Sequence, residues 1–189
     1  MSAPTLRKSD RTRQAILVAA RAHFAERGYD RSSIRAIAAT ASIDPALVIR
    51  YFTSKEQLFA AAVDIDLRLP QLASVAKERR GRVLTEHFIA RWEGELNDDV
   101  LTLLLRSAVT NEQAAERLRD VFREQVVGTL REVVPPEELS RRAALIASQM
   151  LGLALTRYLL RVPGLAERPA QEVVNDIAPT IQRYLVGAL

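Results

Sequence analysis

Cysteine is absent from the 189-residue chain, which excludes disulfide bonds and thiolate metal sites. Histidine is nearly absent too. The only two are His23 and His87, and no His-x-x-x-His pair occurs. Neither a Gly-x-Gly-x-x-Gly turn nor a Gly-Lys-Ser/Thr phosphate loop is present. His23 falls on the inner face of the first expected helix, where we interpret it as a structural residue. We therefore expect a protein that is not an enzyme, with no catalytic residue, no metal and no cofactor.

A long uninterrupted hydrophobic run is also missing. The most apolar segment, AALIASQMLGLALTRYLL at 143–160, is broken by Ser148, Gln149, Thr156 and Arg157. A membrane span needs about 20 predominantly apolar residues with few charges, so we interpret this segment as a helix buried on two sides. The basic N-terminus is not followed by the apolar stretch of a signal peptide. These features favour a cytoplasmic protein without a membrane partner.

Basic charge is unevenly distributed along the chain. Residues 1–60 contain ten Lys and Arg against five Asp and Glu, whereas the remainder contains 17 basic and 18 acidic residues. The whole basic surplus therefore lies in the first third, which indicates an anionic partner for that part. A solvated arginine-rich face is the alternative interpretation of the same charges.

Strand-like alternation is absent, and almost every segment has helical periodicity, so we predict an all-α fold of about nine helices. Gly28, Pro135–Pro136 and Pro163–Gly164 mark helix ends. The expected helices cover 9–27, 33–40, 45–51, a stretch from 54 toward Pro70, 79–93, 98–109, 111–134, 137–161 and 168–187.

Residues 33–52 combine two short helices with a three-residue turn, which predicts a helix-turn-helix unit. Ile43 and Val48 can close the angle between the two helices, and Phe52 can anchor the end of the second. Asp44 is suited to cap this second helix, and Pro45 is suited to its first position.

The outer face of the second helix is more apolar than a solvated surface helix would be, which indicates that it docks on a partner. A helix fits the major groove of B-DNA, where Arg50 can pair with guanine and Ala46 and Leu47 can contact thymine methyl groups. Lys55 is suited to a phosphate. The candidate DNA-binding residues are Ser32, Ser33, Arg35, Pro45, Ala46, Leu47, Ile49, Arg50, Tyr51 and Lys55.

The first third of the chain closely resembles the DNA-binding domain of TetR-type transcriptional regulators. The similarity rests on AILVAARAHFAERGYDRSSIRAIA followed by ASIDPALVIRYFTSKEQLF, and in particular on the joint spacing of Gly28-Tyr29, Ile37-Ala38, Tyr51-Phe52 and Lys55-Glu56-Gln57-Leu58. Two positions depart from the family pattern. Ser42 replaces a frequent glycine in the turn, and Ile49 replaces a frequent tyrosine that contacts phosphate in relatives.

The resemblance implies a helix-turn-helix DNA-binding domain of three helices at 1–55, joined by a fourth helix to an effector-binding and dimerisation domain at 56–189. It also implies a homodimer that binds a pseudo-palindromic double-stranded operator, and a small-molecule effector whose binding releases the DNA. We expect a repressor with an apolar effector. The sequence leaves open whether the protein represses or activates, and which operator and effector it binds.

Two sets of residues in the remaining chain fit these roles. The expected dimer interface uses Ala147, Leu151, Gly152, Ala154, Leu155, Tyr158, Ile177, Ile181 and Leu185. The expected effector pocket has walls from Phe88, Trp92, Leu96, Leu103, Leu104, Phe122 and Val126, and polar groups from His87, Arg106 and Gln125. Completion of a monomeric core is the alternative for both sets. A small helical enzyme or lipid carrier with the same apolar pocket is the alternative for the whole protein, and it predicts no salt-dependent DNA affinity.

Overall fold

The computed structural model describes residues 7–94 and 99–189, and in these residues it contains helices and connecting segments but no β-strand. The chain forms two compact units. The N-terminal unit comprises residues up to Ile65 together with Asp99–Leu118, and the C-terminal unit comprises Asp66–Asp98 and Arg119–Leu189. The predicted all-α fold is confirmed. The compact units do not divide at residue 55, because the fourth helix and a later segment group with the first three helices.

The N-terminal unit is built around α1 (Lys8–Arg31), which is joined by α2 (Ile34–Thr40), α3 (Pro45–Phe52), α4 (Lys55–Ala62), α6 (Asp99–Ala108) and the start of α7 (Glu112–Val121). α1 buries Ile16 and Phe24, which share a core with fully buried residues of α2 and α4. Gly28, where we expected the first helix to end, has φ 75° and ψ 169° and kinks α1 before a last turn. Only glycine adopts such a conformation readily.

The fourth helix is shorter than we predicted, because it ends at Ala62 instead of continuing toward Pro70. Arg21 Nε of α1 donates to the Ala62 carbonyl oxygen at 2.9 Å and so satisfies the helix end. Asp64 and Asp66 follow directly, and a carboxylate near a helix C-terminus opposes the helix dipole. Asp66 Oδ1 then accepts the backbone N–H of Arg68 at 2.8 Å, which fixes a local turn.

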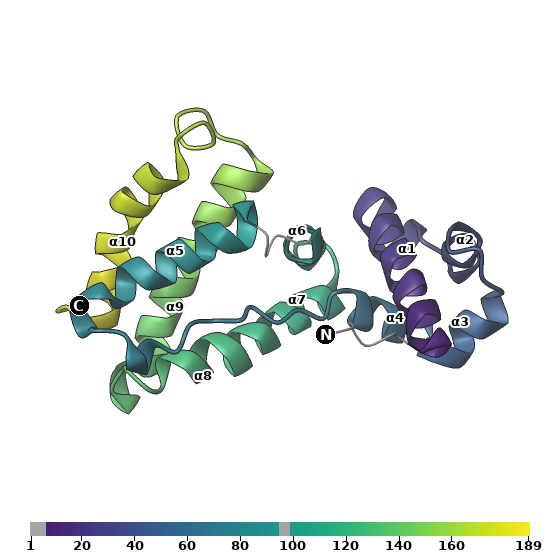
Figure 1. The fold of residues 1–189 in the computed structure, drawn as a ribbon, viewed down its shortest axis with the longest axis horizontal. Coiled ribbons are helices and arrows are strands. Elements are labelled where there is room, and N and C mark those ends of the chain that lie inside the picture. The colour runs from purple at the N-terminus through teal and green to yellow at the C-terminus, as the bar shows by residue number, and fades with distance from the viewer. Residues whose placement is uncertain (1–6, 95–98) are drawn as a thin grey trace, which may run out of the picture. The chain divides into compact units, whose positions relative to one another are not determined.

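The C-terminal unit contains α5 (Arg80–Glu93), α8 (Val127–Leu130), α9 (Pro136–Leu153) and α10 (Ala170–Val186), with short 3₁₀ turns at Leu72–Ser74 and Lys77–Arg79. α5 and α10 lie side by side (Figure 1). Their contact is closest at Gly81, where a Cβ atom would lie 2.5 Å from the backbone nitrogen of Gln182. The Gly81 N–H donates to Gln182 Oε1 at 2.7 Å.

Two of the predicted long helices contain π-helical turns. One, Phe122–Val126, leads into α8, and the other, Ala154–Leu159, extends α9. The second contains the buried Arg157, which donates to Glu93 Oε1 at 2.7 Å and to the Arg168 carbonyl oxygen at 2.9 Å. These partners account for a charged residue in the most apolar segment. In the described part of the chain, no helix has the length and apolarity that a membrane crossing requires.

Candidate functional site

The turn between α2 and α3 has the hydrogen bonds of a Schellman helix end. The N–H of Ser42 donates to the Ala39 carbonyl oxygen at 3.1 Å, and the N–H of Ile43 donates to the Ala38 carbonyl oxygen at 2.9 Å. Ser42 has φ 55° and therefore occupies the left-handed position that glycine favours. The departure from the family pattern at this residue thus changes the chemistry of the turn but keeps its geometry.

α3 begins and ends at well-defined positions. The Asp44 side chain accepts the N–H of Ala46 at 2.7 Å, and Pro45 occupies the first turn. At the other end, Ser54 N–H donates to the Phe52 carbonyl oxygen at 2.6 Å across Thr53, which has φ 63° and ψ −46°. This is a γ-turn with positive φ, a rare conformation that is strained for a β-branched residue. Buried Val48 and Phe52 fix the inner face of α3.

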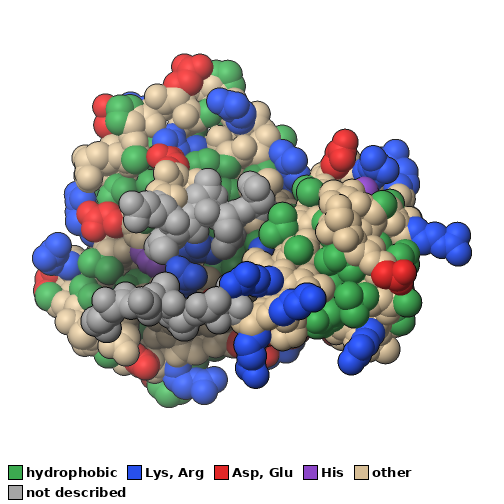
Figure 2. Space-filling view, turned by 45° about the vertical axis from the view of Figure 1, so that its right-hand side comes forward, with side chains coloured by type: hydrophobic (Ala, Val, Ile, Leu, Met, Phe, Trp, Pro, Cys, Tyr) green, Lys and Arg blue, Asp and Glu red, His purple; other side chains and the backbone are tan. Residues whose placement is uncertain are grey.

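The opposite face of α3 is open to a partner. Pro45, Ala46 and Arg50 are exposed, Ile49 is 44% exposed, and Leu47 is half-buried. Tyr51 is also half-buried. Ser33, just before α2, and Arg35, in its first turn, are both exposed. Figure 2 shows Lys and Arg side chains beside exposed hydrophobic side chains on the surface of the molecule.

Ser32 is the exception among the candidate DNA-binding residues, because it is 3% exposed. Its hydroxyl donates to the Gly28 carbonyl oxygen at 2.8 Å and to the His23 carbonyl oxygen at 3.1 Å, so it satisfies the end of α1. The expectation that Ser32 contacts phosphate is therefore corrected. Ser33 is the cap of α2, with its side chain accepting the N–H of Ala36 at 3.2 Å.

Lys55, at the start of α4, contacts Tyr29 and Asp30, which were not among the predicted DNA-binding residues. Its Nζ lies 4.2 Å from the centre of the Tyr29 ring and 3.4 Å from the Asp30 carbonyl oxygen. The Tyr29 hydroxyl donates to Glu56 Oε1 at 2.9 Å. Burial, together with this hydrogen bond and the Glu56 charge, raises the pKa of Tyr29 to about 12. In the sequence, the Gly28-Tyr29 and Lys55-Glu56 dipeptides of the family pattern contain the residues that make these contacts.

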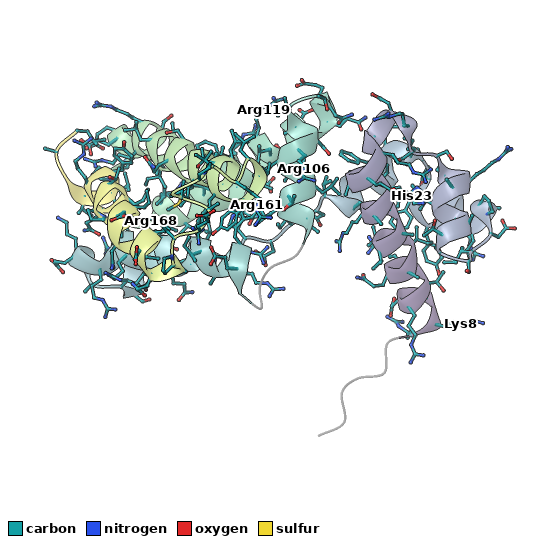
Figure 3. All side chains as sticks on the ribbon, turned by 90° about the horizontal axis from the view of Figure 1, so that it is seen from above. Lys8, His23, Arg106, Arg119, Arg161 and Arg168 are labelled. Carbon is teal, nitrogen blue, oxygen red and sulfur yellow. The ribbon has the colours of Figure 1, made fainter. Side chains whose placement is uncertain are left out.

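His23, which lies on α1 (Figure 3), is 8% exposed, and its Nε2 is 2.7 Å from Thr40 Oγ1 at the end of α2. This contact supports the structural interpretation of His23. In the described residues, no group of three or more His, Asp or Glu side chains is arranged to hold a metal ion.

The expected effector-pocket residues are divided between the two units. Leu103 and Arg106 belong to the N-terminal unit, whereas Phe88, Trp92, Phe122, His87 and Gln125 belong to the C-terminal unit. Leu103 and Leu104 are buried in the core, Val126 packs on the core of the C-terminal unit, and Leu96 lies outside the described residues.

The polar groups expected in the pocket bind the backbone instead. His87 Nε2 lies 2.9 Å from the Leu67 carbonyl oxygen, and Gln125 Oε1 accepts the Leu67 N–H at 2.7 Å. The aromatic residues gather nearby on α5 and the second π turn. Trp92 stacks on Tyr158 with ring centres 4.7 Å apart, and the Phe88 and Trp92 ring centres are 6.2 Å apart.

The expected dimer-interface residues also separate into two groups. Leu151, Gly152 and Leu155 are exposed on α9 and its π-helical extension, and Ala147, Tyr158 and Ile177 are half-buried. Ala154, Ile181 and Leu185 are 1%, 0% and 2% exposed within a single chain. These three side chains complete the core of the C-terminal unit, which corrects the expectation that they contact a partner.

Comparisons with known families agree with this geometry. Residues 16–62 match the family model described as bacterial regulatory proteins of the tetR family. Residues 78–185 match the model described as the tetracyclin repressor-like C-terminal domain. No curated protein matches the sequence.

Several solved structures resemble the chain along most of its length. A TetR-family regulator from Streptomyces coelicolor A3 is 27% identical, with a TM-score of 0.60 and coverage of 97% of this chain and 99% of that chain. NalD, the secondary repressor of the MexAB-OprM multidrug efflux pump in Pseudomonas aeruginosa, is 22% identical, with a TM-score of 0.71 and coverage of 96% and 100%. A putative transcriptional regulator from Saccharomonospora viridis in complex with choline is 19% identical, with a TM-score of 0.63 and coverage of 92% and 96%. At these last two identities, the likeness concerns the fold alone.

Proposed function

The chain belongs to the TetR family of DNA-binding transcriptional regulators, and from that membership we propose that it is a repressor released from its operator by a small, largely apolar effector. In this proposal the protein acts in the cytoplasm as a homodimer on a pseudo-palindromic operator, with one α3 helix in each of two successive major grooves. The observation that carries the proposal is the capped, rigidly anchored α3 helix, whose outward face combines apolar side chains with Arg50.

Base reading is assigned to the exposed residues of α3. Arg50 can donate two hydrogen bonds to the major-groove edge of guanine, and Ala46 and Leu47 can contact thymine methyl groups. Pro45 and Ile49 complete the apolar part of this face. Since Ile49 has no hydroxyl, it adds contact area but no hydrogen bond to a phosphate.

Phosphate binding is assigned to residues around α3. Ser33, Arg35, Tyr51 and Lys55 carry donors that can bind backbone oxygens and so orient the helix in the groove. Lys55 is suited to this role because the Tyr29 ring, 4.2 Å from its Nζ, restrains the lysine while leaving its charge unneutralised.

The effector site is assigned to the C-terminal unit alone. Phe88, Trp92 and Phe122 supply apolar surface, and His87 and Gln125 supply polar groups that already bind the Leu67 backbone. An effector that competes for these two side chains would free the segment that follows α4. In this way effector binding could change the position of the DNA-binding helices. Leu103 and Arg106 are not part of this assignment.

The dimer interface is assigned to the exposed stripe of Leu151, Gly152 and Leu155, flanked by Ala147 and Tyr158. Leu151 is 41% and Leu155 45% exposed, which leaves apolar surface available to a second copy of the chain. Replacing Gly152 by Trp tests this placement. A Cβ atom at Gly152 meets no atom within 4 Å in the single chain, so the substitution should disturb a partner and not the fold.

We expect Gly152→Trp to sediment as a folded monomer and to lose most of its operator affinity, because two linked half-sites bind far more tightly than one. Unchanged dimer mass in sedimentation would contradict this placement of the interface. Val18→Trp, at a 57% exposed position on α1, is the matched control and should remain a dimer.

Enrichment of genomic DNA fragments on the purified protein tests the proposed function as a whole. The expected result is a family of fragments that share one pseudo-palindromic sequence, bound with an affinity that falls steeply as salt rises. Binding with no shared sequence, or binding that does not respond to salt, would contradict the proposal. The alternative of a small helical enzyme or lipid carrier predicts that no such fragments are enriched.

A further inference from the structure

A small cavity lies wholly within the N-terminal unit. Its volume is about 240 Å³, and its lining comes from the last turns of α1 and from the segment where α6 meets α7. The apolar part of the lining includes Phe24 and Leu103, both of which are buried. The volume is below the range typical of drug-sized ligands, so an occupant would have to be small.

The charge around this cavity is strongly positive. Arg27, Arg31 and Arg106 line it, against the single carboxylate of Asp30. Arg106, on α6 (Figure 3), is exposed and makes no hydrogen bond or ion pair with any residue in the described ranges. Arg31 uses only its Nε, which donates to the Arg27 carbonyl oxygen at 3.2 Å.

Arg27 is only weakly paired, because its Nε is 3.8 Å from Glu26 and both side chains are exposed. Guanidinium groups bind phosphate and carboxylate through two parallel hydrogen bonds. Three such groups with so few protein partners thus form a donor set for an anion.

The wall formed by α6 adds a polar group without a partner. Ser107 is 9% exposed and lines the cavity, and its hydroxyl makes no hydrogen bond to the residues that the structure describes. The hydroxyl is therefore available to donate to an anion in the cavity. Asn111, which precedes α7, accepts the Ala114 N–H through its Oδ1 at 2.9 Å. Its amide N–H groups remain as donors on the same side of the cavity.

We propose that this cavity binds a small organic or inorganic anion with two or more adjacent phosphate or carboxylate groups, held by Arg27, Arg31 and Arg106 and by the Ser107 hydroxyl. The site is distinct from the effector site assigned to the C-terminal unit and from the face of α3. Its occupant would link α1 to α6 and would therefore stabilise the unit that carries the DNA-binding helices.

Calorimetric titration of the full-length protein, free of DNA and at constant ionic strength, tests the site with two probes, pyrophosphate and citrate. The wild type should bind at least one of them saturably, one per chain. Arg106→Gln should weaken this binding at least tenfold, because a charge-assisted hydrogen bond is lost. Ser107→Ala, which removes only the hydroxyl, should weaken it severalfold.

Arg141→Gln is the matched control, since Arg141 is an exposed arginine of α9 in the other unit, and its binding should equal that of the wild type. Circular dichroism verifies that each variant is folded. Tighter binding of pyrophosphate assigns the site to phosphates, and tighter binding of citrate assigns it to carboxylates.

The absence of saturable binding to both probes would overturn the proposal, as would equal affinities of the Arg106→Gln and Arg141→Gln variants. So would an Arg106→Gln variant that binds the probes normally but has lost operator affinity, because the cavity would then belong to the DNA interface.

Discussion

Replacing Ser42 by glycine should stabilise the protein, because the turn between α2 and α3 places a serine where glycine is favoured. Ser42 has φ 55°, and its N–H and that of Ile43 close the end of α2. A left-handed conformation costs a residue with a Cβ about 1–2 kcal/mol. Glycine avoids this cost but loses about 0.5–1 kcal/mol more conformational entropy on folding.

The net expectation for Ser42→Gly is a gain of about 0.5–1 kcal/mol in the free energy of unfolding. The serine side chain is exposed and makes no hydrogen bond in the described part of the structure, so its removal forfeits little. For a chain of this size, the gain corresponds to a rise of about 1–4 °C in melting temperature.

Thermal and urea unfolding followed by circular dichroism measure this change, and amide hydrogen exchange locates it in α2 and α3. The two compact units need not unfold together, so the local measurement is the more decisive one. Ala39→Gly is the control, because Ala39 is exposed in the last turn of α2 and its replacement should instead destabilise the helix. Equal or lower protection in Ser42→Gly than in the wild type would show that the left-handed conformation of Ser42 does not destabilise the turn.

Three further substitutions test other parts of the structure. Gly81→Ala should lower the free energy of unfolding by about 1–3 kcal/mol, because the new Cβ would overlap the backbone of Gln182, and unfolding in urea measures this loss. Tyr29→Phe should flatten the loss of stability at alkaline pH. Because the folded-state pKa of Tyr29 is raised to about 12, the wild type loses stability as pH rises from about 10 to 12. The difference in melting temperature between the two proteins should therefore be constant below about pH 10 and should change only in that range. Glu93→Gln should cost about 1–3 kcal/mol in the same urea assay, since the buried guanidinium of Arg157 loses its carboxylate partner, and unchanged stability would contradict a structural role for this pair.

The helix-turn-helix could be predicted from sequence to within a residue or two, because its limits are local. Ser33, Asp44 and Ser54 each cap the helix that they were expected to begin. Proline at the start of α3 adds a signal that depends on no distant contact.

The length of α4, and the partner against which each apolar helix face packs, could not be predicted from local sequence. α4 ends at Ala62 partly because Arg21, 41 positions earlier in the sequence, donates to its last carbonyl. Periodicity indicated that Ile181 and Leu185 face something apolar, but only the structure distinguishes a neighbouring helix from a second chain. Likewise, the sequence around Ser32 indicated an exposed helix cap, whereas in the structure its hydroxyl donates to a carbonyl oxygen of α1.

The division of the effector-pocket residues has the same origin. Residues of α5 and α6 were expected to line one pocket, yet α6 contacts α1 and belongs to the N-terminal unit. Sequence distance is a poor guide to which helices share a core, since helices can pack with any partner whose apolar face fits.

Selection from a randomised duplex library, with the wild type, Arg50→Ala and Lys55→Ala compared at fixed salt, tests whether the outward face of α3 reads DNA sequence. The wild type should select one pseudo-palindrome, and Lys55→Ala should bind all sequences more weakly but select the same one. Arg50→Ala should lose about 1–3 kcal/mol of discrimination per half-site at one base pair. If Arg50→Ala selects the same sequence with the same margin, Arg50 contacts a phosphate, and a wild type that selects no sequence at all would show that α3 does not read DNA.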